Sequence, residues 1–369
     1  MFFAANIIHQ RGKKMITEER AKIAWKNSKF ILEKIAKAKK GDNIIMLADS
    51  ESYSNARLFC ECAKDLGINS FIADVDIYGG EEGYDNIPIM EPLRQAVLHA
   101  DIAFMVTPQI KTNFAKYLGS DKDSDAYLTG VGKRYIFEIA GLDKWNIDEE
   151  EVLKNRTRAE KLFTWLKKAD EVHVTTEAGT DFYCKVGNSP DGMYPVEGII
   201  PFYSEVAVIP SIGSANGVVV ADGASERAYN QRKFPIRANL PGYREIYKKP
   251  LRMVYKDSVL VEYSGDAEQV KRLDKLMEAV SPKPNLCDEL GIVATTSIEN
   301  NIYGWQVDGS HQIHCVHVAI GNNSQRGEII HSTEHIDFDI HDPVIYVDGN
   351  CIYKDGKFND ELIDKMGIE

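Results

Sequence analysis

The histidines of this 369-residue chain are concentrated in one short segment. Six of its nine histidines lie between residues 311 and 341, and five carboxylates lie between residues 328 and 342. Imidazole and carboxylate side chains together form protein sites for zinc, manganese or iron. The segment therefore predicts a divalent-metal site, with a polar surface loop of an acidic protein as the alternative. The residues are His311, His314, His317, His331, His335, His341, Glu328, Glu334, Asp337, Asp339 and Asp342.

Within this segment, His335 and Asp337 have the most informative spacing. They are separated by one residue in the sequence HIDFD. On an extended strand, residues i and i+2 point to the same face. A strand here would supply two metal ligands from one rigid element. The same pair also begins the two-histidine, one-carboxylate arrangement of non-haem iron sites. By contrast, His173 in EVHVTT is interpreted as an ordinary sheet residue.

The composition argues against several classes of partner. The chain has 56 acidic and 44 basic side chains, a net charge of -12, which repels nucleic-acid phosphates and anionic lipid. No apolar run approaches the roughly 20 residues that span a bilayer. The six cysteines are dispersed, as expected for reduced thiols. We therefore expect a cytoplasmic protein that binds neither nucleic acid nor membrane.

The helices and strands that position these residues can be predicted from the sequence pattern, which differs between the two halves of the chain. Up to about residue 140, helical periods alternate with short Ile, Val and Phe-rich runs, which predicts parallel βαβ units. The glycine patterns GxGxxG and GxxxxGK[ST] of nucleotide-binding turns do not occur. A long helical pattern over 148–168 follows. After residue 170, short strands and turns predominate, with one helix predicted over 267–280 and an Asp-Gly hairpin near the end.

The length and this change of pattern predict two domains. We expect a doubly wound α/β domain over residues 16–170. A β-rich α+β domain over residues 171–369 should carry the metal site. Residues 1–15 are expected to form a disordered leader, since Met15 before ITEER is a plausible second start.

Two motifs of the C-terminal half resemble the thermophilic-metalloprotease-like superfamily. The sequence HCVHVAIG, followed by HSTEHIDFDI and a strand ending in VDG, is similar to the C-terminal signature of that superfamily. The superfamily contains the M29 aminopeptidases of the T and S types and the 2,5-dihydroxypyridine dioxygenases. The resemblance covers about residues 175–350. It implies five metal ligands, which are Glu205, Glu289, His317, His335 and Asp337.

These five residues match four parts of the pattern. His317 precedes the step Ala-Ile-Gly, and His335 with Asp337 forms the later His-x-Asp. Glu205 lies in SEVAVIPSIGSANGVVV and Glu289 in CDELGI. A further block of the superfamily is similar to AGTDF at residues 178–182.

Two positions depart from the aminopeptidase pattern. Ser324 stands where those enzymes have a tyrosine, and Ser204 stands where a glycine is usual. The tyrosine would stabilise an oxyanion, and loss of one such donor costs on the order of 10²–10³ in rate. The substitution favours a different amide substrate, such as a small cyclic or heteroaromatic one.

The implied ligand set is suited to hydrolysis. Three carboxylates and two imidazoles can hold two divalent ions, which polarise a carbonyl and activate water. We expect zinc, cobalt or manganese, with Glu289 as bridging ligand or base and Glu205 as a ligand in an amide or peptide hydrolase. The resemblance further implies a small-molecule or short peptide substrate and a homodimer or higher homo-oligomer.

A ring-cleaving dioxygenase with one non-haem Fe(II), acting on a dihydroxypyridine-like substrate, is the alternative. By resemblance, that branch needs neither a carboxylate at position 205 nor a histidine at position 317. At the position of the first histidine of the dioxygenase pattern, this chain has Asp288 or Glu289. The ligand inventory therefore favours the hydrolase. A metal-binding protein without catalysis is a third hypothesis.

Overall fold

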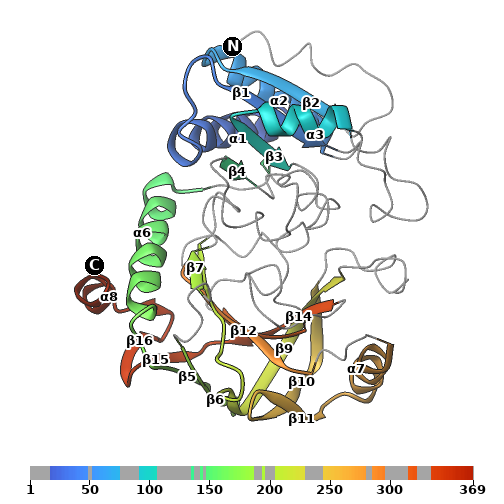
Figure 1. Ribbon diagram of the computed structural model, residues 1–369, viewed down its shortest axis with the longest axis vertical. Coiled ribbons are helices and arrows are strands. Elements are labelled where there is room, and N and C mark those ends of the chain that lie inside the picture. Colours follow the sequence, from blue (N-terminus) through green and yellow to red (C-terminus); the bar gives the residue numbers. More distant parts are fainter. Residues whose placement is uncertain are drawn as a thin grey trace. The chain divides into compact units, whose positions relative to one another are not determined.

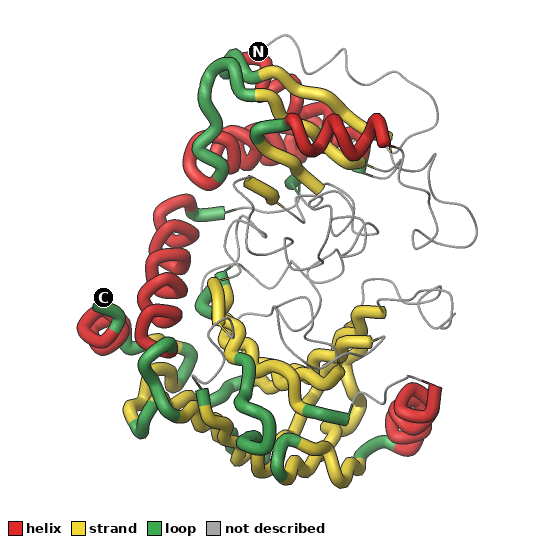
Figure 2. The backbone as a smooth tube through the Cα atoms, viewed as in Figure 1, coloured by secondary structure: helices red, strands yellow, loops and turns green. Residues whose placement is uncertain are grey.

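The computed structural model shows a mixed α/β protein (Figures 1 and 2). It describes residues 17–48, 52–74, 91–105, 134–136, 142–143, 147–186, 193–195, 204–228, 244–279, 285–295, 315–321 and 334–368. These residues form two compact units, one up to residue 149 and one from residue 150 onward. The predicted leader lies outside the described residues. None of the described helices has the length and apolar content needed to cross a membrane.

The first unit contains a four-stranded parallel sheet in the order β2-β1-β3-β4. This order confirms the predicted βαβ pattern, because parallel neighbours require crossover connections. Strand β1 is buried along most of its length, as expected for an inner parallel strand. The elements are α1 (Glu18–Phe30), the π-helix η2 (Ile31–Ile35), β1 (Asn43–Ala48), α2 (Tyr53–Asp65), β2 (Asn69–Asp74), α3 (Glu91–His99), β3 (Ile102–Met105) and β4 (Arg134–Ile136).

The second unit contains a curled sheet of 13 strands (Figures 1 and 2). Its main path runs β17-β16-β15-β5-β6-β9-β14-β13-β12-β8-β7, with β10 and β11 attached through β9. The strands are β5 (Glu171–Thr175), β6 (Asp181–Lys185), β7 (Met193–Pro195), β8 (Glu205–Val208), β9 (Asn216–Ala228), β10 (Arg244–Lys256), β11 (Val259–Ser264), β12 (Cys287–Val293), β13 (Cys315–Gly321), β14 (Glu334–His341), β15 (Val344–Val347), β16 (Asn350–Lys354) and β17 (Lys357–Phe358).

In the described part of the chain, three helices accompany this sheet, namely α6 (Glu149–Leu166), α7 (Ala267–Ala279) and α8 (Asp360–Met366). The helices predicted over 148–168 and 267–280 correspond to α6 and α7. Four residues of α6 are part of the hydrophobic core of this unit, which are Ala159, Leu162, Trp165 and Leu166. The predicted Asp-Gly hairpin joins β15 to β16. Asp348 and Gly349 both have positive φ (48° and 73°), as a type I′ turn requires.

The central strands β8, β12, β13 and β14 have two chemically different faces. Alternate residues of these strands are apolar and belong to the hydrophobic core, which are Val206, Val208, Leu290, Ile292, Val316, Val318, Ile320, Ile336, Phe338 and Ile340. The residues between them point to the opposite face because the side-chain period of a strand is two. That opposite face carries the predicted metal ligands.

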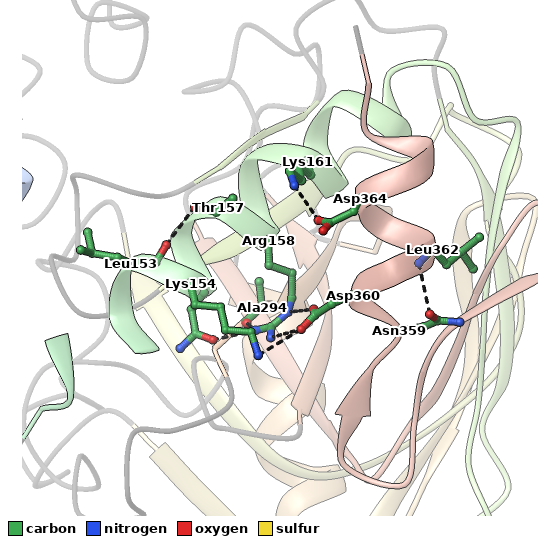
Figure 3. Close-up of polar contacts among 11 residues, drawn as sticks. Leu153, Lys154, Thr157, Arg158, Lys161, Ala294, Asn359, Asp360, Leu362 and Asp364 are labelled. Carbon is green, nitrogen blue, oxygen red and sulfur yellow. Dashed lines mark hydrogen bonds and ion pairs between the residues drawn. The ribbon is translucent and has the colours of Figure 1, made fainter. Parts of the chain in front are cut away.

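A buried arginine connects the helices α6 and α8 (Figure 3). The guanidinium of Arg158 donates hydrogen bonds to both carboxylate oxygens of Asp360, at 2.6 and 3.1 Å. It also donates to the carbonyl oxygen of Ala294 at 2.8 Å and to the side chain of Asn155 at 2.6 Å. Because Ala294 directly follows β12, one side chain attaches both helices to the end of a central strand.

Replacement of Arg158 by methionine should destabilise the second unit by about 2 kcal/mol, since it leaves the buried carbonyl of Ala294 without this donor and Asp360 with Lys154 as its remaining cationic partner. The 35% exposure of the Asp360 side chain keeps this cost below that of a fully buried pair. Urea unfolding of the Arg158→Met variant measures this loss of stability. As a matched control, Lys161→Met removes the exposed pair with Asp364 and should cost about 0–1 kcal/mol. Equal losses of unfolding free energy in the two variants would contradict the assignment of Arg158 as the residue that attaches both helices to β12.

Candidate metal centre

Three of the predicted ligands meet on neighbouring strands. Glu205 begins β8, Glu289 lies in β12 and His317 lies in β13. One ligand atom from each lies within 4.8 Å of the other two, and all three residues are buried. Nε2 of His317 lies 3.4 Å from a carboxylate oxygen of Glu205 and 3.8 Å from one of Glu289. These residues are 28 to 112 positions apart in sequence, so strand pairing alone brings them together.

Strand register explains how they share a face. His317 pairs with Gly291, and Glu289 pairs with Ala319. Glu205 pairs with Val293 on the other side of β12. Cross-strand partners point to the same face of a sheet. All of these positions therefore belong to the face opposite the hydrophobic core.

Asp337 in β14 approaches the same group from the other side of β13. It pairs with Ala319, which also pairs with Glu289, so the two acidic residues flank a small alanine. Asp337 is fully buried, and its charge contributes to the raised pKa of His317. Four of the five predicted ligands are thus on one buried face.

The remaining predicted ligand, His335, also lies in β14. It pairs with Gly321 and Arg227, and strand alternation places it on the same face as Asp337. Its side chain lies outside the description. His311, His314, Ser324 and His331 also lie outside the described residues. Their predicted roles stay predictions.

Neighbouring carboxylates control the charge of His317. Burial by itself lowers the pKa of this imidazole, but the charge of Glu205, the contact with Glu289 and the charge of Asp337 outweigh it. Together they raise the pKa from 6.5 to about 9. His317 therefore carries a proton at neutral pH when no cation takes its place.

The start of β8, and with it Glu205, is fixed by a pair of reciprocal contacts. The backbone N–H of Ser204 donates to the Thr295 hydroxyl at 2.8 Å, and that hydroxyl donates to the Ser204 carbonyl at 3.2 Å. The N–H of Ala294 donates to the same carbonyl at 2.9 Å. Ser204 and Thr295 are both buried. The position where the resemblance expected glycine is therefore part of a rigid strand end.

Sequence reasoning assigned no role to Asp339, although it belongs to the histidine-rich segment. Asp339 is fully buried and pairs with His317 on one side and Gly223 on the other. The alternation in EHIDFDIH could have placed it beside Asp337, because the two aspartates are two positions apart in one strand. It is a further acidic residue of the site face.

The structure also separates Glu289 from its neighbour Asp288. Both side chains are buried, but a register shift in β12 lies between Cys287 and Glu289. The charge of Asp288 adds to the effect of burial in raising the pKa of Tyr255, a residue of the hydrophobic core. Of the two acidic residues, Glu289 is the one that joins Glu205 and His317.

Two other histidines have different environments. His173 lies in β5, pairs with Tyr183 and Tyr346, and contacts a carboxylate oxygen of Asp181 at 2.7 Å. This agrees with its interpretation as a sheet residue. His341 contacts Asp222 at 2.5 Å and is half-buried.

The donor set fits a divalent metal ion. Two carboxylates and one imidazole with converging ligand atoms are a common partial ligand set for zinc, manganese or iron. Glu205, Glu289 and His317 could therefore hold a metal, and Asp337 lies on the same face.

Comparisons with solved structures identify the fold. A 2,5-dihydroxypyridine dioxygenase from Pseudomonas putida KT2440 has a TM-score of 0.65 at 13% identity, over 93% of this chain and 98% of that chain. Wild-type AmpT from Thermus thermophilus has a TM-score of 0.56 at 14% identity, over 92% and 99%. The sequence matches no protein-family model and no curated protein. The chain thus has the fold expected from the resemblance, over nearly the full length of both neighbours.

The raised pKa of His317 predicts pH-dependent metal binding. A bound cation must displace the imidazole proton, so affinity should rise by up to about tenfold per pH unit as the pH is raised toward about 9 and should level off above it. Titration of chelator-treated protein with manganese at several pH values measures this.

The metal-free protein should show the opposite trend in stability. Because the folded pKa lies above the unfolded value, protonated His317 stabilises the fold fully below pH 6.5, and this contribution is lost as the pH rises through about 9. His317→Ala should remove both trends. An affinity independent of pH over this range would contradict the electrostatic description.

Proposed function

We propose that the protein is a metal-dependent hydrolase of amide or peptide bonds, similar to the M29 aminopeptidases. The observation that carries the proposal is the meeting of Glu205, Glu289 and His317 in one buried group. Glu205 and His317 are the two positions that the dioxygenase branch, by resemblance, does without. In this chain both are buried and only 3.4 Å separates their polar atoms.

In this proposal the metal is zinc, cobalt or manganese, held by Glu205, Glu289, His317, His335 and Asp337. When bound, the metal supplies a Lewis acid for the substrate carbonyl and lowers the pKa of water. Glu205 orients His317 through the close contact of their polar atoms. Glu289, on the strand between them, is assigned to hold and move a proton, because a buried carboxylate accepts a proton more readily than an exposed one.

The proposed substrate is an amide smaller than a general peptide. This part of the proposal depends on Ser324, which replaces the tyrosine of the aminopeptidase pattern. A serine hydroxyl has a much shorter reach than a tyrosine hydroxyl. A small cyclic or heteroaromatic amide, whose developing oxyanion needs no such distant donor, would suit the site.

A ring-cleaving dioxygenase remains the second candidate function. One observation favours it, since the dihydroxypyridine dioxygenase has the higher TM-score of the two neighbours, 0.65 against 0.56. Likeness of fold does not transfer chemistry, because one fold supports different reactions through different site residues. The metal content separates the two candidates.

Elemental analysis of protein purified without added metal is the first test. A hydrolase with the full ligand set should contain up to two equivalents of zinc, cobalt or manganese per chain. One equivalent of iron, together with oxygen uptake on dihydroxypyridines, would move the assignment to the dioxygenase. Protein that neither retains nor binds any of these metals would contradict both.

Individual substitutions test the ligand assignment. Asp337→Ala and His335→Ala should each abolish metal retention, because both remove a ligand from β14. Glu205→Gln keeps the side-chain volume but removes its charge. It should reduce amide hydrolysis by more than the roughly 10–100-fold typical of groups that only support a ligand.

The control for these substitutions is His173→Ala, which changes a histidine outside the group and should leave metal content unchanged. Full metal occupancy in the Asp337 or His335 variant would refute the site. A fully active Glu205→Gln enzyme with bound iron would favour the dioxygenase.

A further inference from the structure

Gly291 occupies a place where glycine needs an explanation. It lies inside β12, fully paired with β13 on one side and β8 on the other. Glycine in a strand interior weakens the strand relative to residues with a side chain. A positive φ would justify it, but Gly291 is not among the glycines with positive φ. The remaining reason for glycine is the space that a side chain would fill.

That space is filled by His317. A β-carbon at position 291 would lie 1.9 Å from Cε1 and 2.0 Å from Nε2 of the imidazole, and 2.7 Å from Oε1 of Glu205. Ordinary contacts of a β-carbon are 3.4 Å or longer. The ring edge that carries Nε2 therefore occupies the position of the missing side chain.

Strand order shows why the ring must lie there. His317 and Glu205 lie on β13 and β8, which are separated by β12. Neighbouring strands are about 4.8 Å apart, so an imidazole on β13 reaches a carboxylate on β8 only by crossing the backbone of β12. Gly291 is the residue directly opposite His317 on that strand.

We propose that Gly291 is a positioning residue, whose missing side chain lets His317 cross β12 to meet Glu205. Any side chain at position 291 displaces the imidazole from the two carboxylates. The metal-binding role of this arrangement rests on the proposed function, whereas the steric coupling between positions 291 and 317 does not. The sequence marks the residue only as the glycine two positions after Glu289 in CDELGI.

The test is a double-mutant cycle of Gly291→Ala and His317→Ala. Gly291→Ala alone should weaken manganese binding by about 10- to 100-fold, the range for residues that orient metal ligands. In the His317→Ala background the added methyl meets no imidazole, and its remaining close contact is with the end of the Glu205 side chain at 2.7 Å. There it should cause a much smaller further loss of binding than in the wild-type background. It should also raise the urea midpoint, because alanine is preferred to glycine in a strand.

Circular dichroism and urea unfolding of metal-free protein complete the experiment. If Gly291→Ala fails to fold, recovery of folding in the double variant supports the proposal, and failure of both variants overturns it. Equal loss of stability in the two backgrounds would overturn the proposal, because it would show that Gly291 affects only the strand. Manganese binding by Gly291→Ala at the wild-type affinity would also overturn the proposal. If the wild-type protein binds no metal, the proposed function fails. Urea unfolding of the double-mutant cycle still tests the steric coupling between positions 291 and 317.

Discussion

Four antiparallel strands, β8, β12, β13 and β14, carry apolar side chains on one face and carboxylate, imidazole and small side chains on the other. The two-residue period of a strand makes these faces inseparable, because the backbone that aims Val316 and Val318 into the core aims His317 away from it. A register slip by one residue would exchange the faces and bury the ligands among apolar side chains. Core packing therefore fixes the positions of the site residues.

Small residues are as important to this face as charged ones. Gly291 leaves room for the imidazole between β13 and β8, and Ala319 separates Glu289 from Asp337. Buried carboxylates are stable only when neighbouring groups compensate their charge. The raised pKa of His317 is the measurable sign of that compensation. A divalent cation would replace one proton with two positive charges at the same place.

Rigid strand ends support the same arrangement. The Ser204–Thr295 contacts fix the beginning of β8, directly before Glu205. Arg158 donates to the carbonyl of Ala294 and so joins the neighbouring end of β12 to the helices α6 and α8. Two solved structures with a similar fold are a 2,5-dihydroxypyridine dioxygenase and AmpT. One fold supports different functions through different site residues, so the fold does not by itself define a function.

The sequence by itself determined the local elements and the residue types of the site. Helical and strand periods predicted α6, α7, the parallel strands of the first unit and the β15–β16 hairpin, because these depend on neighbours in the chain. The spacing of His335 and Asp337 likewise predicted one strand, and β14 contains both. The metal-binding role of the pair stays a prediction.

Only the tertiary structure decided which distant residues meet. Strand order and register brought Glu205 and Glu289 to His317 and placed Asp339 beside the site. No local pattern contains this information, since pairing between strands depends on the packing of the whole sheet. The role of Gly291 depends on strand pairing in the same way. Its lack of a side chain matters only because β13 places the His317 ring directly over it.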